Sequence, residues 1–202
     1  MVLTMSMSIS SSQSGRGRQK ARTRAAMIAA ARTLLAQGST PTVEAAAAHA
    51  GISRATAYRY FTNQRELLLA THPMLDMTSL LPQDAPAHPT DRVMAVAEAI
   101  INLILDSEAE LKMSLRLSLE PGFNSDLPLR KGRRLIWFED ALEPLKGKVK
   151  AATLKRLTHA LAASVGVETF VWLVDVVGLP RKEAVNQLLW TARTLMDGAI
   201  GP

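Results

Sequence analysis

The stretch AGISRATAYRYFTNQRELL, residues 50–68, combines a glycine turn, a short segment rich in hydrogen-bond donors and the start of another helix. Gly51 can take the positive φ angle that a tight turn between two helices requires. Ser53 is placed to cap the segment RATAYRYF, and Asn63 followed three residues later by Glu66 has the capping-box spacing that begins a helix. Because the segment carries many donors and few bulky apolar side chains, we expect those donors to bind a partner outside the chain.

Two helices are predicted before this stretch. Residues 18–37 repeat apolar side chains at helical spacing and end at Gly38, which suits a carboxy-terminal cap. The second helix, TVEAAAAHA, begins with Thr42 as its N-cap, and its alanines allow another helix to cross it closely. Three helices with a glycine turn between the second and the third predict a helix-turn-helix arrangement, in which Phe61 packs inward against the first helix.

The composition restricts the class of protein. The chain has 202 residues, of which 48% are hydrophobic, and no cysteine. This content suffices for a sizeable core, and the lack of cysteine excludes disulfides and thiolate chemistry and suits a reducing cytoplasm. Residues 1–15 lack the regions of a signal peptide and are expected to be a disordered tail. No apolar run is long enough to span a membrane.

Chemistry-bearing motifs of enzymes are not found. The four histidines are scattered without metal-ligand spacing, and no glycine-rich phosphate loop, nucleophile–base arrangement or carboxylate pair stands out. The sequence therefore predicts a protein that is not an enzyme and has no metal or cofactor.

Basic residues gather in the first third of the chain. Residues 1–70 contain nine Arg and Lys but only two acids, Glu44 and Glu66, a net charge of +7, whereas the rest has 15 basic and 16 acidic side chains. Such asymmetry favours a polyanion-binding amino-terminal module joined to a nearly neutral body. A basic surface that only aids solubility is the alternative on charge alone.

The rest of the chain consists of one proline-rich segment and further helices. Residues 72–89 contain four prolines and no apolar period, which indicates a linker or an irregular crossover. From residue 90 onward, apolar side chains recur at helical spacing, and no strand pattern is found. We therefore expect an all-α protein of about nine helices.

The donors of the third helix suit the edges of base pairs. A short helix fits the major groove of DNA, which is about 12 Å wide. Arg54 can donate two hydrogen bonds to guanine O6 and N7, and Ala55 and the methyl group of Thr56 can contact a thymine methyl group. Double-stranded DNA is therefore the expected partner.

Other donors of this region suit phosphates. The hydroxyl groups of Tyr58 and Tyr60 lie within reach of the DNA backbone, and Thr42 and Ser53 stand at helix N-termini, which favour phosphate. Half-buried packing explains either tyrosine alone equally well. Arg59 is a further predicted DNA contact, which a solvated surface charge explains equally well.

TVEAAAAHAGISRATAYRYFTNQRELL resembles the DNA-binding motif of the TetR (tetracycline-repressor-like) family of transcriptional regulators, over about residues 20–70. The resemblance implies a homodimer that binds a palindromic operator and is released by a small molecule. Family members often have a lysine at the start of the fourth helix, where this chain has Gln64, which donates a hydrogen bond but releases no counterion. The alternative is a helical interaction protein of the same fold that has lost sequence-specific DNA binding. The resemblance assigns base contacts to Arg54, Ala55 and Thr56, and phosphate contacts to Thr42, Ser53, Tyr58 and Tyr60.

Four regions are expected: a tail at 1–15, a helix-turn-helix DNA-binding domain at 16–71, a linker or crossover at 72–89, and a helical ligand-binding and dimerisation domain at 90–202.

Small and apolar residues at helical spacing on the last two helices favour a four-helix dimer interface, although the same stripes can face the subunit's own core. The predicted interface residues are Ala163, Gly166, Val185, Leu188, Leu189, Ala192, Leu195 and Met196.

A pocket for an apolar or amphipathic effector is expected among the middle helices. Filling it is expected to shift a middle helix and so change the separation of the two recognition helices of a dimer. Core packing is the competing explanation for each of the predicted lining residues, which are Met113, Leu117, Phe123, Trp137, Phe138, His159 and Trp172.

Overall fold

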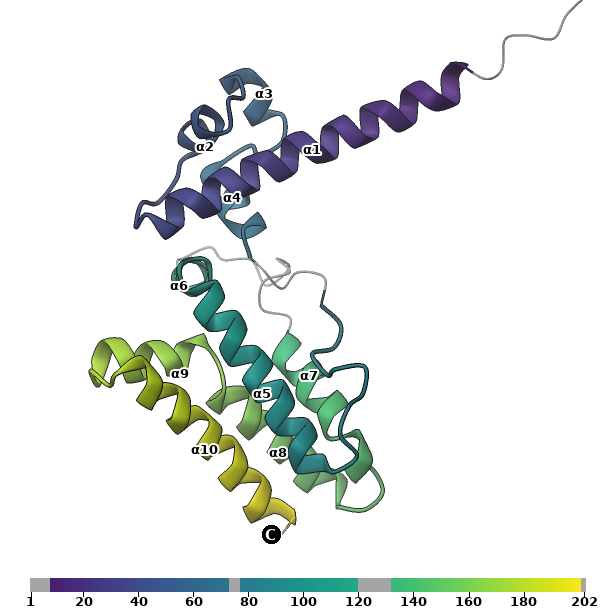
Figure 1. Ribbon diagram of the computed structural model, residues 1–202, viewed down its shortest axis with the longest axis vertical. Coiled ribbons are helices and arrows are strands. Elements are labelled where there is room, and N and C mark those ends of the chain that lie inside the picture. Colours follow the sequence, from purple (N-terminus) through teal and green to yellow (C-terminus); the bar gives the residue numbers. More distant parts are fainter. Residues whose placement is uncertain (1–7, 73–76, 120–131, 201–202) are drawn as a thin grey trace, which may run out of the picture. The chain divides into compact units, whose positions relative to one another are not determined.

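A computed structural model describes residues 8–72, 77–119 and 132–200, and these ranges contain ten α-helices and no strand (Figure 1). The all-α prediction is confirmed. The chain divides into two compact units, Met1–His72 and Pro73–Pro202, which we call the amino-terminal and the carboxy-terminal unit. Within the described ranges, no single helix has both the length and the apolarity of a membrane span; the bent pair Ala151–Ser164 with Val167–Val176 meets these criteria by length and composition alone.

Four helices build the amino-terminal unit: α1 (Ser8–Ala36), α2 (Val43–His49), α3 (Arg54–Tyr58) and α4 (Gln64–Ala70). The prediction of a disordered tail is wrong for residues 8–15, which form the first turns of α1, and residues 1–7 lie outside the described residues. No proline interrupts this part of the chain, and helices tolerate serine and glutamine. Figure 1 shows that the first turns of α1 extend beyond the bundle that its later turns form with α2, α3 and α4.

The interior of the amino-terminal unit consists largely of alanines around one aromatic ring. Phe61 is fully buried, as its predicted inward position requires, and the guanidinium carbon of Arg24 lies 5.3 Å from the centroid of its ring. Alanines let the helix backbones approach closely, so the large side chains in this core are few. The buried cluster contains Met27, Ala30, Ala31, Val43, Ala46, Ala47, Ala57, Phe61, Leu67 and Ala70.

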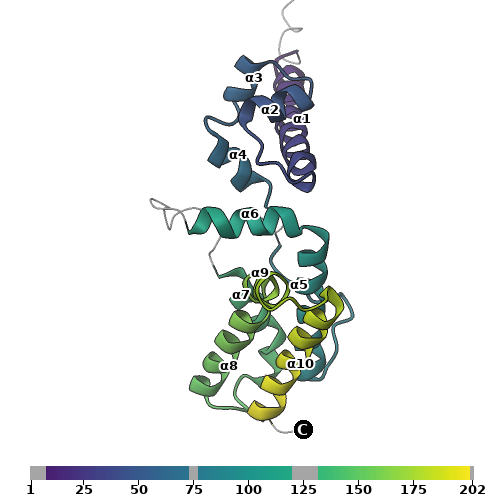
Figure 2. The same cartoon turned by 90° about the vertical axis from the view of Figure 1, so that its left-hand side faces the viewer.

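Six α-helices build the described part of the carboxy-terminal unit: α5 (Pro89–Asp106), α6 (Glu108–Ser118), α7 (Arg133–Ala141), α8 (Ala151–Ser164), α9 (Val167–Val171) and α10 (Arg181–Ile200). A stretch of π-helix, Trp172–Val176, continues α9, and a 3₁₀ turn, Glu143–Leu145, follows α7. Helices α5, α7, α8 and α10 contact one another in a ring around the core. Helix α6 is seen end-on in Figure 1 and lengthwise in Figure 2, so it runs across the end of α5.

The long helix predicted for the region of α8 and α9 is interrupted at Val165 and Gly166. Gly166 is extended, with φ −175° and ψ 170°, and the two helical segments meet at 43°. A side chain of another helix contacts the break: Arg134 of α7 donates from Nη1 to the carbonyl of Val165 at 3.2 Å and from Nη2 to Glu168 at 2.8 Å. The carbonyl freed by the break is therefore satisfied by a side chain that the local sequence does not reveal.

Replacing Gly166 by alanine is expected to destabilise the carboxy-terminal unit by about 1–2 kcal/mol, because hydrogen bonds of Arg134 would be lost. The new Cβ would lie 1.6 Å from Nη1 of Arg134, so the guanidinium group would have to move. The thermal midpoint read by tryptophan fluorescence should fall by roughly 2–8 °C. Gly198→Ala on α10 is the matched control, since nothing lies within 4 Å of its Cβ position. An equal loss in both variants would contradict the role of Arg134.

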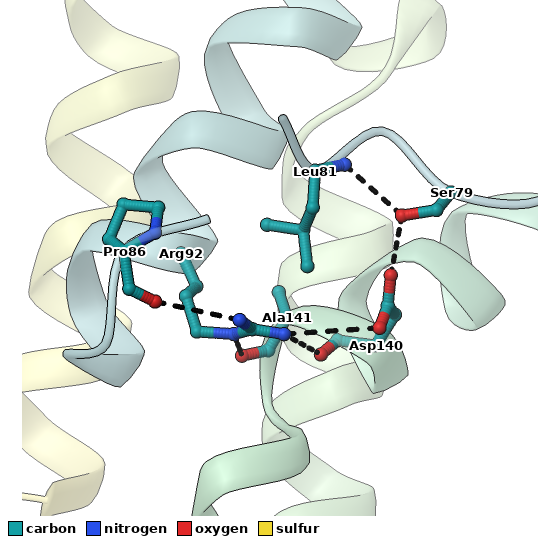
Figure 3. Close-up of polar contacts among 6 residues, drawn as sticks. All are labelled: Ser79, Leu81, Pro86, Arg92, Asp140 and Ala141. Carbon is teal, nitrogen blue, oxygen red and sulfur yellow. Dashed lines mark hydrogen bonds and ion pairs between the residues drawn. The ribbon is translucent and has the colours of Figure 1, made fainter. Parts of the chain in front are cut away.

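Residues 77–88, expected to be part of a linker, pack against α5 and α7 within the carboxy-terminal unit (Figure 3). Arg92 of α5 donates to the backbone carbonyl of Asp140 at 2.9 Å and to that of Pro86 at 3.5 Å. The hydroxyl of Ser79 donates to Oδ2 of Asp140 at 2.5 Å. Hydrogen bonds therefore hold this segment against α5 and α7, although its proline content indicated a linker.

Candidate nucleic-acid interface

Capped turns fix the helices of the predicted DNA-binding motif. Thr42 Oγ1 accepts the amide hydrogen of the third residue after it at 3.1 Å, and Ser53 Oγ does the same at 3.3 Å. Asn63 Oδ1 accepts the amide hydrogen of Glu66 at 2.8 Å, and the carboxylate of Glu66 accepts the amide hydrogen of Thr62 in the preceding loop at 2.9 Å. Gly51 has a φ of +67° in the turn between α2 and α3. The predicted caps and the predicted glycine turn are confirmed.

Helix α3 exposes Arg54 and Ala55, two of the three residues that were predicted to meet DNA bases. Tyr58, a predicted phosphate contact, is exposed too, whereas Ala57 on the opposite face is fully buried. The helix is shorter than the expected RATAYRYF, since it ends at Tyr58 and continues as a turn. Tyr60 lies in that turn and packs partly against the core, so its ring is also a structural element. The exposed donor surface is therefore narrower than the sequence indicates.

The remaining predicted DNA contacts are surface residues, some of which already have partners. Thr56 is half-buried, and its Oγ1 accepts a hydrogen bond from the hydroxyl of Ser53 at 2.9 Å. Arg59 is exposed. Gln64 is exposed too, and its side-chain amide donates to the carbonyl of Pro41 at 3.0 Å, which links the start of α4 to the loop before α2.

An acidic residue that sequence reasoning treated only as a charge lies among these donors. Oε1 of Glu44 on α2 accepts the hydroxyl hydrogen of Tyr58 at 2.5 Å and lies 3.1 Å from Nη2 of Arg54. The hydrogen bond from Tyr58, with smaller contributions that include the charge of Arg54, holds the pKa of Glu44 below its usual range. The same hydrogen bond raises the pKa of Tyr58. Glu44 is thus ionised at neutral pH and Tyr58 is protonated.

Helix α1 adds positive charge to the same unit. Lys20, Arg22 and Arg24 are exposed on it. The two acids of residues 1–70, Glu44 and Glu66, are both engaged, one with α3 and the other in the cap of α4. The basic side chains therefore dominate the surface charge of the unit.

The predicted pocket residues do not all lie together. Leu117, Trp137 and Phe138 are buried in the carboxy-terminal unit, and Met113 is half-buried. His159 and Trp172 are exposed, so they do not lie with the buried residues of this set, and their place in a pocket stays a prediction. His159 faces outward because Leu157 and Leu161 direct the other face of α8 to the core. Phe123 lies outside the described residues. Nor does the described part of the chain bring together three His, Asp or Glu side chains that could hold a metal ion.

The predicted dimer residues divide into buried and accessible ones. Leu188, Ala192 and Met196 are buried in the unit's own core and Gly166 is buried beside Arg134, so the prediction that these four contact a second chain is wrong. Val185, Leu189 and Leu195 are half-buried against the same core, and Ala163 is exposed. The apolar stripe of α10 thus covers its own subunit. Its opposite face carries Trp190, which is 62% exposed and was not singled out from the sequence.

Comparison with known proteins places the amino-terminal unit in a family. Residues 27–71 match the family described as "Bacterial regulatory proteins, tetR family". The match extends from the middle of α1 to the end of α4 and includes the three capped turns. No curated protein sequence matches the chain. The amino-terminal unit is therefore a DNA-binding domain of the tetR family, which supports a DNA-binding transcriptional regulator.

Proposed function

We propose that this regulator is a cytoplasmic repressor that binds a palindromic operator as a homodimer and leaves it when a small apolar or amphipathic effector binds. The observation that carries the DNA part is the outward α3 of a basic unit, on which the Arg54 side chain is 74% exposed. Arg54 donates to guanine O6 and N7, and Ala55 and Thr56 contact thymine methyl groups.

Phosphate contacts surround this base-reading surface in the proposal. Thr42 and Ser53 are the N-caps of α2 and α3, where backbone amides also favour phosphate, and the hydroxyl of Tyr58 reaches Glu44 in the first turn of α2. Arg59 follows α3, and the exposed basic residues of α1 add charge that releases counterions from DNA. These contacts fix the register of the protein on the duplex and carry no sequence information themselves.

The homodimer is supported by helix surface that the core of the carboxy-terminal unit leaves uncovered. Trp190 of α10 is exposed on the face opposite Leu188 and Ala192, and Ala163 of α8 is exposed too. A large aromatic side chain on the outer face of a helix is typical of a protein interface. A dimer is also what operator reading needs, because two recognition helices about 34 Å apart read two half-sites on one face of DNA.

The effector is proposed to act through α6, which carries the predicted pocket residue Met113. Ion pairs join the first turns of α6 to its neighbours: Lys112 Nζ lies 2.7 Å from Asp175 Oδ2, and Glu108 pairs with Arg181 at the start of α10. The hydrogen bond from Arg181 holds the pKa of Glu108 below its usual range, so Glu108 is ionised at neutral pH. A ligand that displaces α6 has to break these ion pairs. It shifts the protein from the DNA-bound to the released state only as far as it binds the released state more tightly.

A helical interaction protein without sequence-specific DNA binding is the second candidate. The observation that favours it is the hydrogen bond of Gln64 to Pro41, which occupies one donor at a position where many TetR proteins have a phosphate-binding lysine. The exposed basic residues of α1 and α3 weigh against it, because they keep the charge that duplex binding requires.

Selection of duplexes from a random pool by the full-length protein tests the proposal. The selected fragments should share a palindrome, and the logarithm of the affinity should fall linearly with the logarithm of salt concentration. Arg54→Ala should reduce the preference for the selected sequence by roughly ten- to hundredfold, since a bidentate guanine contact is lost. A pool without a shared sequence, together with binding that salt does not weaken, would support the interaction protein instead.

A further inference from the structure

Glu44 makes its side-chain contacts with the two residues on which DNA binding by α3 is proposed to depend. A single oxygen, Oε1, accepts the hydrogen of the Tyr58 hydroxyl and lies within ion-pair distance of Arg54. The guanidinium carbon of Arg54 also lies 5.7 Å from the centroid of the Tyr58 ring. The three side chains therefore form one connected cluster, which we call the Glu44 cluster, on the surface of α2 and α3.

The cluster occupies donors that the DNA complex needs. A tyrosine hydroxyl has one hydrogen to donate, so Tyr58 cannot donate to a phosphate while it donates to Glu44. Arg54 has five N–H donors, but in the cluster its charge is neutralised by the carboxylate. A phosphate that accepts a hydrogen bond from Tyr58 therefore has to replace Glu44, and a base that approaches Arg54 meets a guanidinium already paired with a carboxylate.

The contacts of Glu44 are not explained by helix stability alone. Glu44 lies in the first turn of α2, where a carboxylate interacts favourably with the helix dipole. That interaction requires no contact with α3, whereas the bonds to Tyr58 and Arg54 span two helices. The other acid of the unit, Glu66, differs in that its carboxylate caps its own helix through Thr62.

We propose that Glu44 is a positioning residue that holds Arg54 and Tyr58 together in the absence of DNA, and that a duplex binds α3 by taking the hydrogen bond of Tyr58 from it and by competing with it for the charge of Arg54. The proposal rests on the DNA-binding function of this unit. Exchange of the Glu44 carboxylate for a phosphate oxygen replaces one charge-assisted hydrogen bond by another, so it yields little free energy. Glu44 consequently lowers the affinity for duplex DNA of every sequence and makes the bound state easier to leave.

Replacing Glu44 by glutamine tests this inference with a fluorescently labelled duplex of arbitrary sequence and the full-length chain. The affinity of Glu44→Gln should rise about tenfold, because a neutral amide oxygen holds the two donors more weakly than a carboxylate does and a negative charge is removed from the interface. Glu98→Gln is the matched control: it removes the same charge from an exposed position of α5 and should change the affinity less than about twofold. A Glu44→Gln affinity equal to that of the control would overturn the proposal.

Two further variants separate competition for donors from simple repulsion between Glu44 and phosphates. Glu44→Asp keeps the charge but shortens the side chain, so the carboxylate withdraws from α3 and the affinity should still rise. In an Arg54→Ala/Tyr58→Phe background, Glu44→Gln should have no effect, since the residues through which Glu44 acts are gone. If Glu44→Asp binds like the wild type and Glu44→Gln still tightens binding in that background, repulsion is the cause and the proposal is wrong.

The titration of Tyr58 reports the cluster in the folded protein without DNA. The chain has two tyrosines, so Tyr60→Phe leaves Tyr58 as the only source of tyrosinate absorbance. The hydrogen bond to Glu44 raises the pKa of Tyr58, and Arg54 opposes that shift to a smaller extent. Adding Glu44→Gln to Tyr60→Phe should therefore lower the midpoint of this titration. An unchanged midpoint would mean that the cluster does not form in solution.

Failure of this inference is distinguishable from failure of DNA binding itself. A wild-type protein that binds duplexes with steep salt dependence, but whose affinity Glu44→Gln leaves unchanged, disproves only the role of Glu44. A wild-type protein that binds no duplex at low salt disproves the function on which the inference rests, and the Tyr58 titration still tests the cluster.

Discussion

Replacing Phe61 by alanine is expected to unfold the amino-terminal unit and abolish DNA binding, while the carboxy-terminal unit stays folded. Phe61 is fully buried, and its neighbours in the core are mostly alanines, which cannot move into the space that the ring leaves. Truncation of a buried phenylalanine to alanine costs about 3–5 kcal/mol. A unit of this size has only a small margin of stability, so the loss is a large part of the total.

The distribution of aromatic residues makes this outcome measurable. All three tryptophans, Trp137, Trp172 and Trp190, belong to the carboxy-terminal unit, so tryptophan fluorescence reports only on that unit. In Phe61→Ala the tryptophan transition should be unchanged, whereas helical circular dichroism should decrease and DNA binding should be lost. Phe138→Ala is the matched control, because Phe138 is fully buried in the other unit and its truncation should move the tryptophan transition instead. Retention of wild-type DNA affinity by Phe61→Ala would refute the packing described for Phe61.

Features set by short-range interactions could be predicted from the sequence. The N-caps at Thr42 and Ser53 and the bond from Glu66 to Asn63 each join residues three positions apart, so the sequence contains both partners. The positive φ of Gly51 depends on the residue itself. These local constraints determine how α2 and α3 are joined, which explains why the helix-turn-helix arrangement was foreseeable.

The interruption between α8 and α9 could not be predicted, because the side chain that contacts it is distant in sequence. The residues on both sides form good helical patterns, and the small residues around Gly166 resemble a contact site for another helix. The break is accommodated by Arg134, which belongs to α7 and reaches the Val165 carbonyl across the fold. Periodicity within one segment contains no information about such a partner.

The hydrogen-bond donors of the candidate site were predicted from the sequence, but its acceptor, Glu44, was not. Arg54 and Tyr58 stand out because they lie close together on one short helix. Glu44 is 14 positions from Tyr58, and its acidic character is common in the first turn of any helix. The one available signal was the scarcity of acidic residues in this part of the chain, since residues 1–70 contain only two.

The apolar stripe on α10 illustrates a second limit of periodicity. The spacing of Leu188, Ala192 and Met196 correctly indicates a buried helix face, but it does not say which chain buries it. In the structure the subunit's own core covers these residues. The residue left for a partner is Trp190, which belongs to no apolar stripe because the residues three and four positions from it on the helix, Asn186, Gln187, Arg193 and Thr194, are polar.

Replacing Trp190 by glutamate is therefore expected to convert the proposed dimer to a monomer and to reduce operator affinity at least about a hundredfold. Trp190 is 62% exposed in the single chain, so a glutamate there costs the folded monomer little, whereas a charge buried without a partner in an interface is costly. A monomer reads one half-site and loses the base contacts of the second α3, which accounts for the fall in affinity. Affinity for DNA of arbitrary sequence should fall much less, because its electrostatic contacts do not depend on half-site spacing.

Sedimentation velocity decides the first part of this prediction, since the chain has a mass of 21.9 kDa and a dimer has twice that mass. Ile136→Glu is the matched control: Ile136 of α7 is 50% exposed, so the variant introduces the same charge at another exposed apolar position. It should leave both the mass and the operator affinity unchanged. A Trp190→Glu protein that remains a dimer would place the interface elsewhere on the carboxy-terminal unit. A monomeric wild type with undiminished operator binding would instead mean that one copy of α3 is enough, which is hard to reconcile with the few base pairs that a helix ending at Tyr58 can reach.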